Sequence, residues 1–452
     1  MKKRRLKNKV LYNLIPILII LFLFLVTFGI YKFVFQEKDL LFLEQIESST
    51  YANITHYAIY GIHMNIEGNI TLNQTPEQID LVLANAKTEK KLNWELTQEN
   101  NKYSFSTSKY INEGINLENL PQENLYLLIK TLEKNENNEI VTKYYSVENE
   151  SNYQDLEYYT LTKNNKNNKI DIEWNTYEEC PTLRFKIKEA TLPNEVYDIT
   201  IDPGHDARDP GKAVCSNGYD PDWSGNCQEG TLYKESDLNL ITSLKLKSEL
   251  EKMGYKVAMT RETEEDEVNI YDSMGSATMA NDTKSKFNLA IHHNSSGING
   301  GDYYLKGLEI YIANDTNIDF AKNILSEIII NANTQASPKK QYLVEPGIYQ
   351  RFFTEDEILD DTVQPSNKTT NTIYYYNLRE VGGISTNASN DGRYAPYYPK
   401  NEHYNSNNTA ESYLLELGYM DNVSELENIV NNSQGYATGI ASAIQKYLEQ
   451  EK

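Results

Sequence analysis

Basic residues are scarce beyond the first 35 positions of this chain. Seven of the 43 Lys and Arg residues and none of the 65 Asp and Glu residues lie in that stretch, so the remainder holds 36 bases against 65 acids, a formal charge of −29. Such a surface repels polyanions. DNA and RNA are excluded as partners, because their binding depends on neutralising phosphates. A solvated acidic exterior accounts for the charge by itself.

Cysteine is also scarce, and the three cysteines present allow one disulfide with one thiol left over. Cys215 and Cys227 lie close together in a stretch rich in Gly, Asn and Asp. This favours a bridge that closes a short loop, with Cys180 free or paired with another molecule. Spacing alone leaves two ordinary thiols as the alternative.

Formal charge is absent from Val10 to Tyr31, where most side chains are Leu, Ile, Phe or Val. A helix of this length, at about 1.5 Å per residue, crosses a hydrocarbon layer of roughly 30 Å. A cleaved signal peptide is the alternative, but no small-x-small pattern follows the run. Six basic residues precede it. The positive-inside rule therefore predicts a cytoplasmic tail at 1–9, a transmembrane anchor at 10–35 and an extracytoplasmic remainder, as in a single-pass protein of the cell membrane.

Short alternating runs predict β-strands between the anchor and residue 190. Ile62, Met64 and Ile66 alternate with polar residues, and further apolar runs are separated by polar turns. The pattern predicts an all-β, sandwich-like domain over 36–190. It contains no catalytic constellation, so a spacer or interaction module is expected, joined to the rest by a linker at 191–195.

Strand and helix patterns alternate from Val196 onward, which predicts an α/β domain over 196–452. The expected architecture is an open, mostly parallel twisted sheet with helices on both faces. A polar, Tyr- and Asn-rich insertion at about 334–410 fits this scheme poorly. Such a stretch is either a disordered insertion or a lid and groove wall near the site, and its tyrosines could stack on sugars or simply pack.

Chemistry-bearing side chains follow the predicted strands, at the edge where such sheets bind ligands. His205 follows the first strand of this region, His292 ends a later one, Glu416 ends the last, and Glu235 opens a helix. Two imidazoles, a carboxylate and a water form an open zinc site, and a second carboxylate can act as base. Taken singly, each of these residues is more often structural, and their spacings match no local zinc motif.

Four segments in this region resemble the zinc-dependent N-acetylmuramoyl-L-alanine amidases, also called type 3 amidases. They are Ile201-Asp202-Pro203-Gly204-His205, Lys234-Glu235-Ser236-Asp237-Leu238-Asn239-Leu240, Ile291-His292-His293-Asn294-Ser295 and Leu415-Glu416-Leu417-Gly418-Tyr419-Met420-Asp421-Asn422. The resemblance implies that one zinc ion is bound by His205, Glu235 and His292, and that Glu416 is the catalytic carboxylate. His293 is expected to point to the other side of its strand.

The sequence also departs from the family's pattern. Asp206 stands where the family usually has glycine, Ala290 replaces a common serine, and an arginine is missing near Met274 and Gly275. None of these changes removes a ligand or the base.

The resemblance implies a hydrolase that cuts the amide bond between N-acetylmuramic acid and L-alanine in peptidoglycan. One alternative is an inactive or regulatory scaffold that binds peptidoglycan. Another is a zinc hydrolase of a different amide, such as a polyglutamate polymer. The sequence leaves room for a protein activator without identifying one.

Overall fold

The computed structural model describes residues 46–107, 114–149, 155–161, 167–177, 180–270, 272–298, 304–313, 318–360, 368–381 and 408–450. The predicted tail at 1–9 and anchor at 10–35 lie outside these ranges. Within them, no helix combines the length and the apolar character that crossing a bilayer requires.

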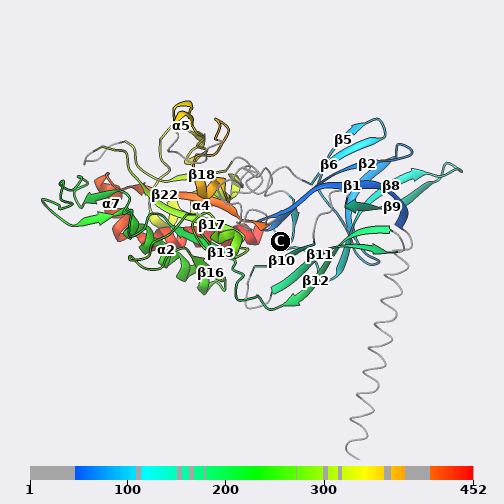
Figure 1. Cartoon of the computed structure of the whole chain (residues 1–452), viewed down its shortest axis with the longest axis horizontal. Helices are drawn as coiled ribbons and strands as arrows, with labels where there is room; N and C mark the ends of the chain where they lie inside the picture. The colour runs from blue at the N-terminus through cyan, green and yellow to red at the C-terminus, as the bar shows by residue number, and fades with distance from the viewer. Residues whose placement is uncertain are drawn as a thin grey trace, which may run out of the picture.

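The described part of residues 46–190, here called the β-domain, consists of strands and turns. Its strands are β1 Ile46–Tyr60, β2 His63–Thr71, β3 Gln78–Ala84, β4 Glu89–Lys91, β5 Glu95–Glu99, β6 Lys102–Ser106, β7 Ile115–Asn116, β8 Asn124–Lys134, β9 Ile140–Asn149, β10 Leu156–Tyr159, β11 Asn167–Tyr177 and β12 Cys180–Ala190. Figure 1 shows them gathered at one end of the molecule.

The β-domain strands belong to one hydrogen-bonded sheet of 13 strands, whose main order is β10-β11-β12-β8-β9-β1-β2-β6-β5. The sequence pattern had indicated two stacked sheets. A continuous ladder arises because β8 pairs with β3, β9 and β12, which links all parts of the sheet. The alternating apolar side chains of most of these strands meet in one hydrophobic core.

The described part of residues 196–450, here called the α/β domain, alternates strands and helices as the sequence indicates. Its elements are β13 Ile199–Pro203, β14 Ala213–Cys215, β15 Leu232–Lys234, α2 Glu235–Lys252, β16 Val257–Met259, α3 Met279–Asp282, β17 Phe287–Asn294, β18 Glu309–Ile312, α4 Ile318–Ala332, β19 Leu343–Glu345, β20 Ile348–Tyr349, α5 Glu355–Leu359, α6 Tyr376–Arg379, β21 Asn408–Thr409, β22 Glu411–Tyr419, α7 Val423–Asn431 and α8 Ser433–Gln450.

The central sheet of the α/β domain has the order β16-β13-β17-β22-β18-β20-β19. The strands β16, β13, β17 and β22 are parallel. The sheet is mixed overall, because β18 runs antiparallel to β22 and β19 antiparallel to β20. The strand β13 is buried at every position, and its polar side chains Thr200 and Asp202 are hydrogen-bonded to Ser285 and Thr260.

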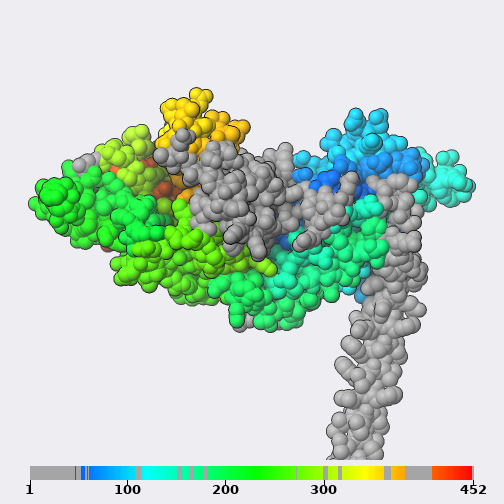
Figure 2. Space-filling view, in the orientation of Figure 1, coloured from blue at the N-terminus to red at the C-terminus, as the bar shows by residue number. Residues whose placement is uncertain are grey.

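The two faces of this sheet are covered differently. Apolar side chains of α2, α4 and α8 form one core with alternate strand residues such as Ile201, Leu289 and Leu415. The opposite face presents Ala290 and Leu414 and is covered by segments of the polar insertion, including the short helix α6. Helices therefore lie on both faces, as expected, but the long ones share one face. Around α5 the insertion projects from the molecule (Figure 2).

Candidate metal centre and catalytic cavity

Four elements deliver the predicted site residues to the carboxyl edge of the sheet. His205 follows β13 after Gly204, His292 lies in β17, Glu235 is the first residue of α2, and Glu416 lies in β22. The pairing of β17 with β22 places His292 directly opposite Glu416. Residues 211 positions apart in sequence thus reach one edge, because parallel strands end on the same side.

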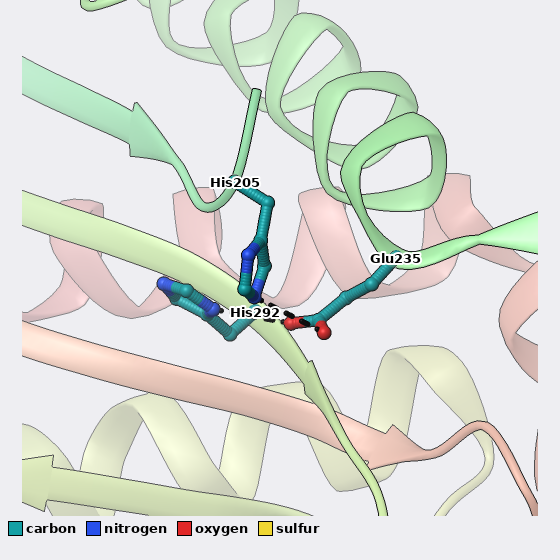
Figure 3. Close-up of side chains that lie close together, drawn as sticks. All are labelled: His205, Glu235 and His292. Carbon is teal, nitrogen blue, oxygen red and sulfur yellow. Dashed lines mark hydrogen bonds and ion pairs between the residues drawn. The ribbon is translucent and has the colours of Figure 1, made fainter. Parts of the chain in front are cut away.

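His205, Glu235 and His292 form a compact cluster in which one ligand atom from each residue lies within 4.8 Å of the others. The Nε2 atom of His205 is 3.2 Å from Oε2 of Glu235, and Nδ1 of His292 is 3.1 Å from Oε1. Figure 3 shows the two imidazoles converging on the carboxylate from β17 and from the loop after β13. The two rings contact each other edge-on, with centroids 5.2 Å apart.

Backbone donors fix the Glu235 carboxylate. Its Oε2 accepts from the Lys212 N–H at 3.1 Å, and its Oε1 accepts from the His293 N–H at 3.3 Å. Gly211 has a φ of +65°, and a Cβ on it would lie 2.6 Å from Oε2 of Glu235. Glycine is required there because it alone combines this conformation with so close an approach.

The imidazole of His205 is oriented by Asp209, whose Oδ2 lies 3.0 Å from its Nδ1. Such a partner fixes which ring nitrogen faces a metal. His205 itself has a φ of +62°, a conformation that non-glycine residues rarely adopt and that occurs at functional sites.

His293 lies apart from the cluster. Its Nδ1 is 2.7 Å from Oδ1 of Asn239, whose side-chain amide donates to the Gly204 carbonyl at 2.9 Å. Burial lowers the pKa of His293 to about 4, so the ring is neutral near neutrality. It supports the loop before His205 rather than facing the cavity.

Asp206, the departure from the family's glycine, fixes the loop after β13. Its carboxylate accepts from the backbone N–H groups of Arg208, Asp209 and Val268 and from the Arg208 guanidinium. Burial alone would raise the pKa of Asp206, but these hydrogen bonds outweigh it and hold the pKa well below its usual range. The ionised side chain thus stabilises the conformation of this loop.

Glu416 is the one predicted site residue outside the metal cluster. Its Oε2 is buried and accepts no hydrogen bond. Burial, with the nearby charges of Glu235 and Glu309, raises the pKa of Glu416 to about 7, against the lowering effect of His292. An unpartnered carboxyl with such a pKa can both accept and release a proton.

Glu309 faces Glu416 from the neighbouring strand β18. It is fully buried and accepts hydrogen bonds from Tyr311 at 2.7 Å, Ser337 at 3.0 Å and Lys339 at 2.9 Å. These donors satisfy the hydrogen-bonding capacity of the buried Glu309 carboxylate on the strand beside Glu416.

A cavity of about 550 Å³ opens over His205, His292 and Glu416. The sequence did not predict most of the other residues that line this cavity. Val268 and Ile270 form an apolar part of the lining, and Tyr375 and Tyr376 of the insertion form another. The insertion therefore contributes part of the cavity wall through Tyr375, Tyr376 and Asn377. Its only sequence signal was the run of three tyrosines at 374–376.

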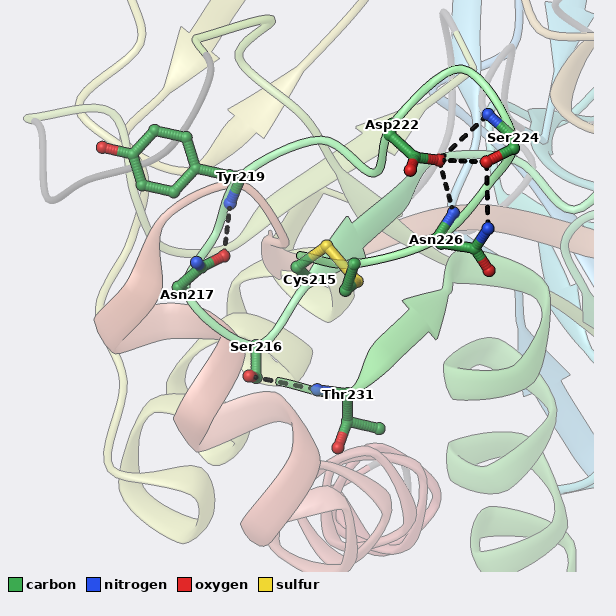
Figure 4. The surroundings of a disulfide bond; sticks show 9 residues. Cys215, Ser216, Asn217, Tyr219, Asp222, Ser224, Asn226 and Thr231 are labelled. Atoms are coloured by element: carbon green, nitrogen blue, oxygen red, sulfur yellow. Dashed lines mark hydrogen bonds between the residues drawn. A yellow bond between two sulfur atoms is a disulfide. The ribbon is translucent and has the colours of Figure 1, made fainter. Parts of the chain in front are cut away.

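A disulfide joins Cys215 and Cys227, which confirms the predicted pairing. It closes the loop between β14 and β15, and β15 leads directly into Glu235. Figure 4 shows the loop, in which Asp222 accepts hydrogen bonds from Ser224 and Asn226. The bridged loop thus lies between two of the three cluster residues in sequence.

The chemistry of the cluster fits a zinc ion. Two imidazoles and one carboxylate are common zinc ligands, and three protein ligands leave a coordination position open. Burial alone would lower the pKa of His205, but the Glu235 and Asp209 carboxylates outweigh this effect and raise the pKa to about 9. The surroundings therefore favour positive charge where these atoms converge.

A family model described as N-acetylmuramoyl-L-alanine amidase matches residues 199–446, which is more than half of the chain and a range that contains the four predicted site residues. A comparison with curated proteins finds no match. Among solved structures, an N-acetylmuramoyl-L-alanine amidase from Clostridium difficile 630 is 20% identical over 57% of this chain and 100% of that chain, with a TM-score of 0.37. The amidase AmiC2 of Nostoc punctiforme is 20% identical over 57% and 99%, with a TM-score of 0.35. The CwlD amidase from Clostridioides difficile, solved in complex with the GerS lipoprotein, is 18% identical over 56% and 99%, with a TM-score of 0.34.

Proposed function

The chain belongs to the N-acetylmuramoyl-L-alanine amidase family, and from this premise we propose that it hydrolyses peptidoglycan with one zinc ion bound by His205, Glu235 and His292. The bond cut is the amide between N-acetylmuramic acid and the L-alanine of the stem peptide. The observation that carries the zinc proposal is the convergence of three ligand atoms within 4.8 Å, next to a cavity that His205 and His292 line.

When bound, zinc supplies Lewis-acid polarisation of a carbonyl and makes water more acidic. The remaining proton transfers are assigned to Glu416. Its carboxylate accepts a proton from the attacking water as the new C–O bond forms. It then delivers that proton to the nitrogen as the C–N bond breaks, so that the product leaves as an amine. The raised pKa of Glu416, about 7, suits both transfers.

The metal ligands and the proton carrier can be separated by mutation. Glu416→Gln removes the proton acceptor and leaves the cluster intact, so it should retain zinc and lose about 10²- to 10⁴-fold in kcat. His205→Ala should lose the metal itself. Zinc content is measured by atomic emission, and product formation by chromatography. A fully active Glu416→Gln protein would refute the assignment of Glu416.

Mass spectrometry of digested peptidoglycan tests the reaction. Purified protein should release stem peptides with a free amino-terminal alanine from intact muropeptides. A chelator should abolish release, and added zinc should restore it. Binding without release would favour the scaffold alternative, whereas cleavage of a stem-peptide bond or of polyglutamate would favour a different amide substrate.

The location of the protein is a second part of the proposal. Its substrate lies outside the cytoplasmic membrane, and the apolar run at 10–31 follows six basic residues. We therefore place the protein in the cell membrane, anchored by one helix with the α/β domain outside. Protease added to intact spheroplasts should degrade the α/β domain. Its full protection would contradict this orientation.

A further inference from the structure

The insertion supplies the wall of the cavity that includes Tyr375. On this face of the sheet, Ala290, Leu414 and Tyr311 form a hydrophobic cluster against which Tyr375 packs. The ring of Tyr375 contacts that of Tyr311 edge-on, with centroids 4.9 Å apart. Tyr311 lies on β18 two residues from Glu309, the residue opposite Glu416. Tyr375 is thus fixed to the strand adjacent to the proposed proton carrier.

The backbone before α6 is held by a buried arginine. Arg379 is 2% exposed, and its Nη1 donates to the carbonyls of Ile373 and Tyr374 at 3.0 and 2.5 Å. The neighbouring Tyr374 ring is covered by the Arg351 guanidinium at 3.5 Å from its centroid, and Arg351 pairs with Glu357 at 2.8 Å. These contacts leave the segment little freedom, so the Tyr375 side chain has a defined position.

The phenol of Tyr375 shares the cavity with His205, His292 and Glu416. Burial and the nearby Glu416 carboxylate raise the pKa of Tyr375 well above its usual value, although the Arg351 charge and hydrogen bonds with Arg351 and Tyr311 oppose this. The phenol therefore stays protonated at neutral pH. Its hydrogen bonds with Arg351 and Tyr311 fix the phenol, which makes Tyr375 a neutral, preorganised hydrogen-bond donor in the lining of the cavity.

We propose that Tyr375 is a further catalytic residue, whose hydroxyl donates a hydrogen bond to the substrate carbonyl oxygen as negative charge develops on it. This inference rests on the proposed amide hydrolysis. As water adds to the carbonyl carbon, the C=O electron pair moves to oxygen. The Tyr375 proton stays on the phenol and only stabilises this negative charge. When the C–N bond breaks, the electron pair on oxygen re-forms the C=O bond. Preorganised donors of this kind accelerate acyl transfer because they act mainly in the transition state.

Tyr375→Phe tests the proposal, because it removes one oxygen atom and keeps the packed ring. In the zinc-loaded full-length protein, kcat for muropeptide cleavage should fall about 10- to 100-fold, with KM and zinc content little changed. Tyr374→Phe is the matched control. It removes the same atom from the neighbouring ring, which does not line the cavity, and should leave kcat within about twofold of the original.

Two results would overturn the role of Tyr375: a Tyr375→Phe protein as active as the original, or one altered in KM alone. If the original protein loaded with zinc releases no stem peptide, the proposed function fails instead, so the two failures are distinguishable. An unchanged melting temperature in Tyr375→Phe shows that the lost activity does not come from unfolding.

Discussion

At the scale of single residues, the site depends on a glycine that has no side chain with which to bind a metal. A Cβ built on Gly204 would overlap the imidazole of His292. Gly204 also precedes His205, and its carbonyl accepts from Asn239 at 2.9 Å and Arg261 at 3.2 Å. The backbone is therefore held in place and cannot shift to relieve the overlap.

The first prediction is that Gly204→Ala weakens metal binding although every ligand is retained. The added methyl group must displace the His292 ring, so zinc affinity should fall by about 10- to 100-fold, the usual effect of disturbing groups that orient ligands. Competition with a fluorescent chelator measures the affinity. Ile140→Ala is the control, because its side chain lies in the β-domain and is 61% exposed. Equal affinity in both variants would show that His292 is not held by this contact.

The four proposed site residues were readable from the sequence because each ends a strand or opens a helix within a recognisable motif. The role of Tyr375 could not be predicted in the same way. It lies in an insertion without strand or helix periodicity, and its place in the cavity depends on packing against Tyr311, a contact between residues 64 positions apart. Similarly, nothing local indicated that Asp206 would accept four hydrogen bonds from its loop and from Val268.

At the scale of elements, the antiparallel pair β14 and β15 separates His205 from Glu235 and is closed by the Cys215–Cys227 disulfide. A bridge between residues 12 positions apart restricts the unfolded chain and contributes about 2 to 4 kcal/mol in the loop-entropy account. Because β15 runs straight into Glu235, loosening the pair also loosens one ligand.

The second prediction concerns the double variant Cys215→Ser and Cys227→Ser. We expect the free energy of unfolding to fall by about 2 to 4 kcal/mol and zinc affinity to fall with it. Urea titration measures the first quantity and chelator competition the second. Cys180→Ser serves as the control for changing a thiol that is not part of this bridge. Unaltered zinc affinity in the double variant would show that Glu235 is positioned without help from the loop.

Strand and helix periodicity predicted the main strands and the long helices of the α/β domain, but not the short elements β14, β15, β19 and β20. The helix expected to open at Glu235 is α2, Glu235–Lys252, and it ends before Gly254, whose φ is +93°. The antiparallel direction of β18 was not predictable, because an isolated apolar run carries no information about its partner's direction. The pairing of the β-domain strands into one sheet was not predictable either, because a strand's sequence does not identify its partners.

At the scale of the whole molecule, the β-domain is joined to the α/β domain rather than tethered to it. The turn between β1 and β2 contains Gly61 and Ile62, and Ile62 belongs to the core of the α/β domain. A Cβ on Gly61, whose φ is +57°, would lie 2.9 Å from Cγ of Glu411 at the start of β22. In addition, β1 pairs with β21, the strand just before β22. A spacer would not need these contacts between the two domains. The sequence did not predict them, because they join residues that are far apart along the chain.

The third prediction is that Ile62→Ala destabilises the α/β domain although Ile62 belongs to the β-domain. Truncating a fully buried isoleucine costs about 2 to 5 kcal/mol. Hydrogen exchange followed by mass spectrometry should show faster exchange in β17 and β22. Ile140→Ala, at a side chain that is 61% exposed, should leave both domains unchanged. Faster exchange confined to the β-domain would contradict a shared core.

Charged groups also meet across this junction. The Glu118 carboxylate of the β-domain accepts from the Tyr158 hydroxyl and the Leu161 N–H, and the Lys286 ammonium lies 4.8 Å from the centroid of the Tyr158 ring. Burial raises the pKa of Glu118, and the lowering effects of Tyr158 and Lys286 do not cancel it. Burial likewise lowers the pKa of Lys286, which is 1% exposed.

The last prediction follows from the direction of the Glu118 shift. A carboxyl whose pKa is higher in the folded than in the unfolded protein stabilises the fold fully below the unfolded pKa, about 4.5, and loses this contribution as pH rises through the folded pKa. Glu118→Gln cannot ionise. Its free energy of unfolding should therefore improve relative to the original protein as pH increases from 4 toward 8, as measured by urea titration across that range.

Glu123, also in the β-domain, provides a control of opposite sign. Hydrogen bonds from Asn85 and Thr88 lower its pKa, so its contribution is present above the unfolded pKa and is lost as pH falls. Glu123→Gln should thus become relatively less stable as pH rises. Parallel pH profiles for the two variants would contradict the argument, because a general effect of removing one negative charge from an acidic protein predicts the same trend for both. Opposite profiles would show that the Glu118 carboxyl resists ionisation at the junction of the two domains.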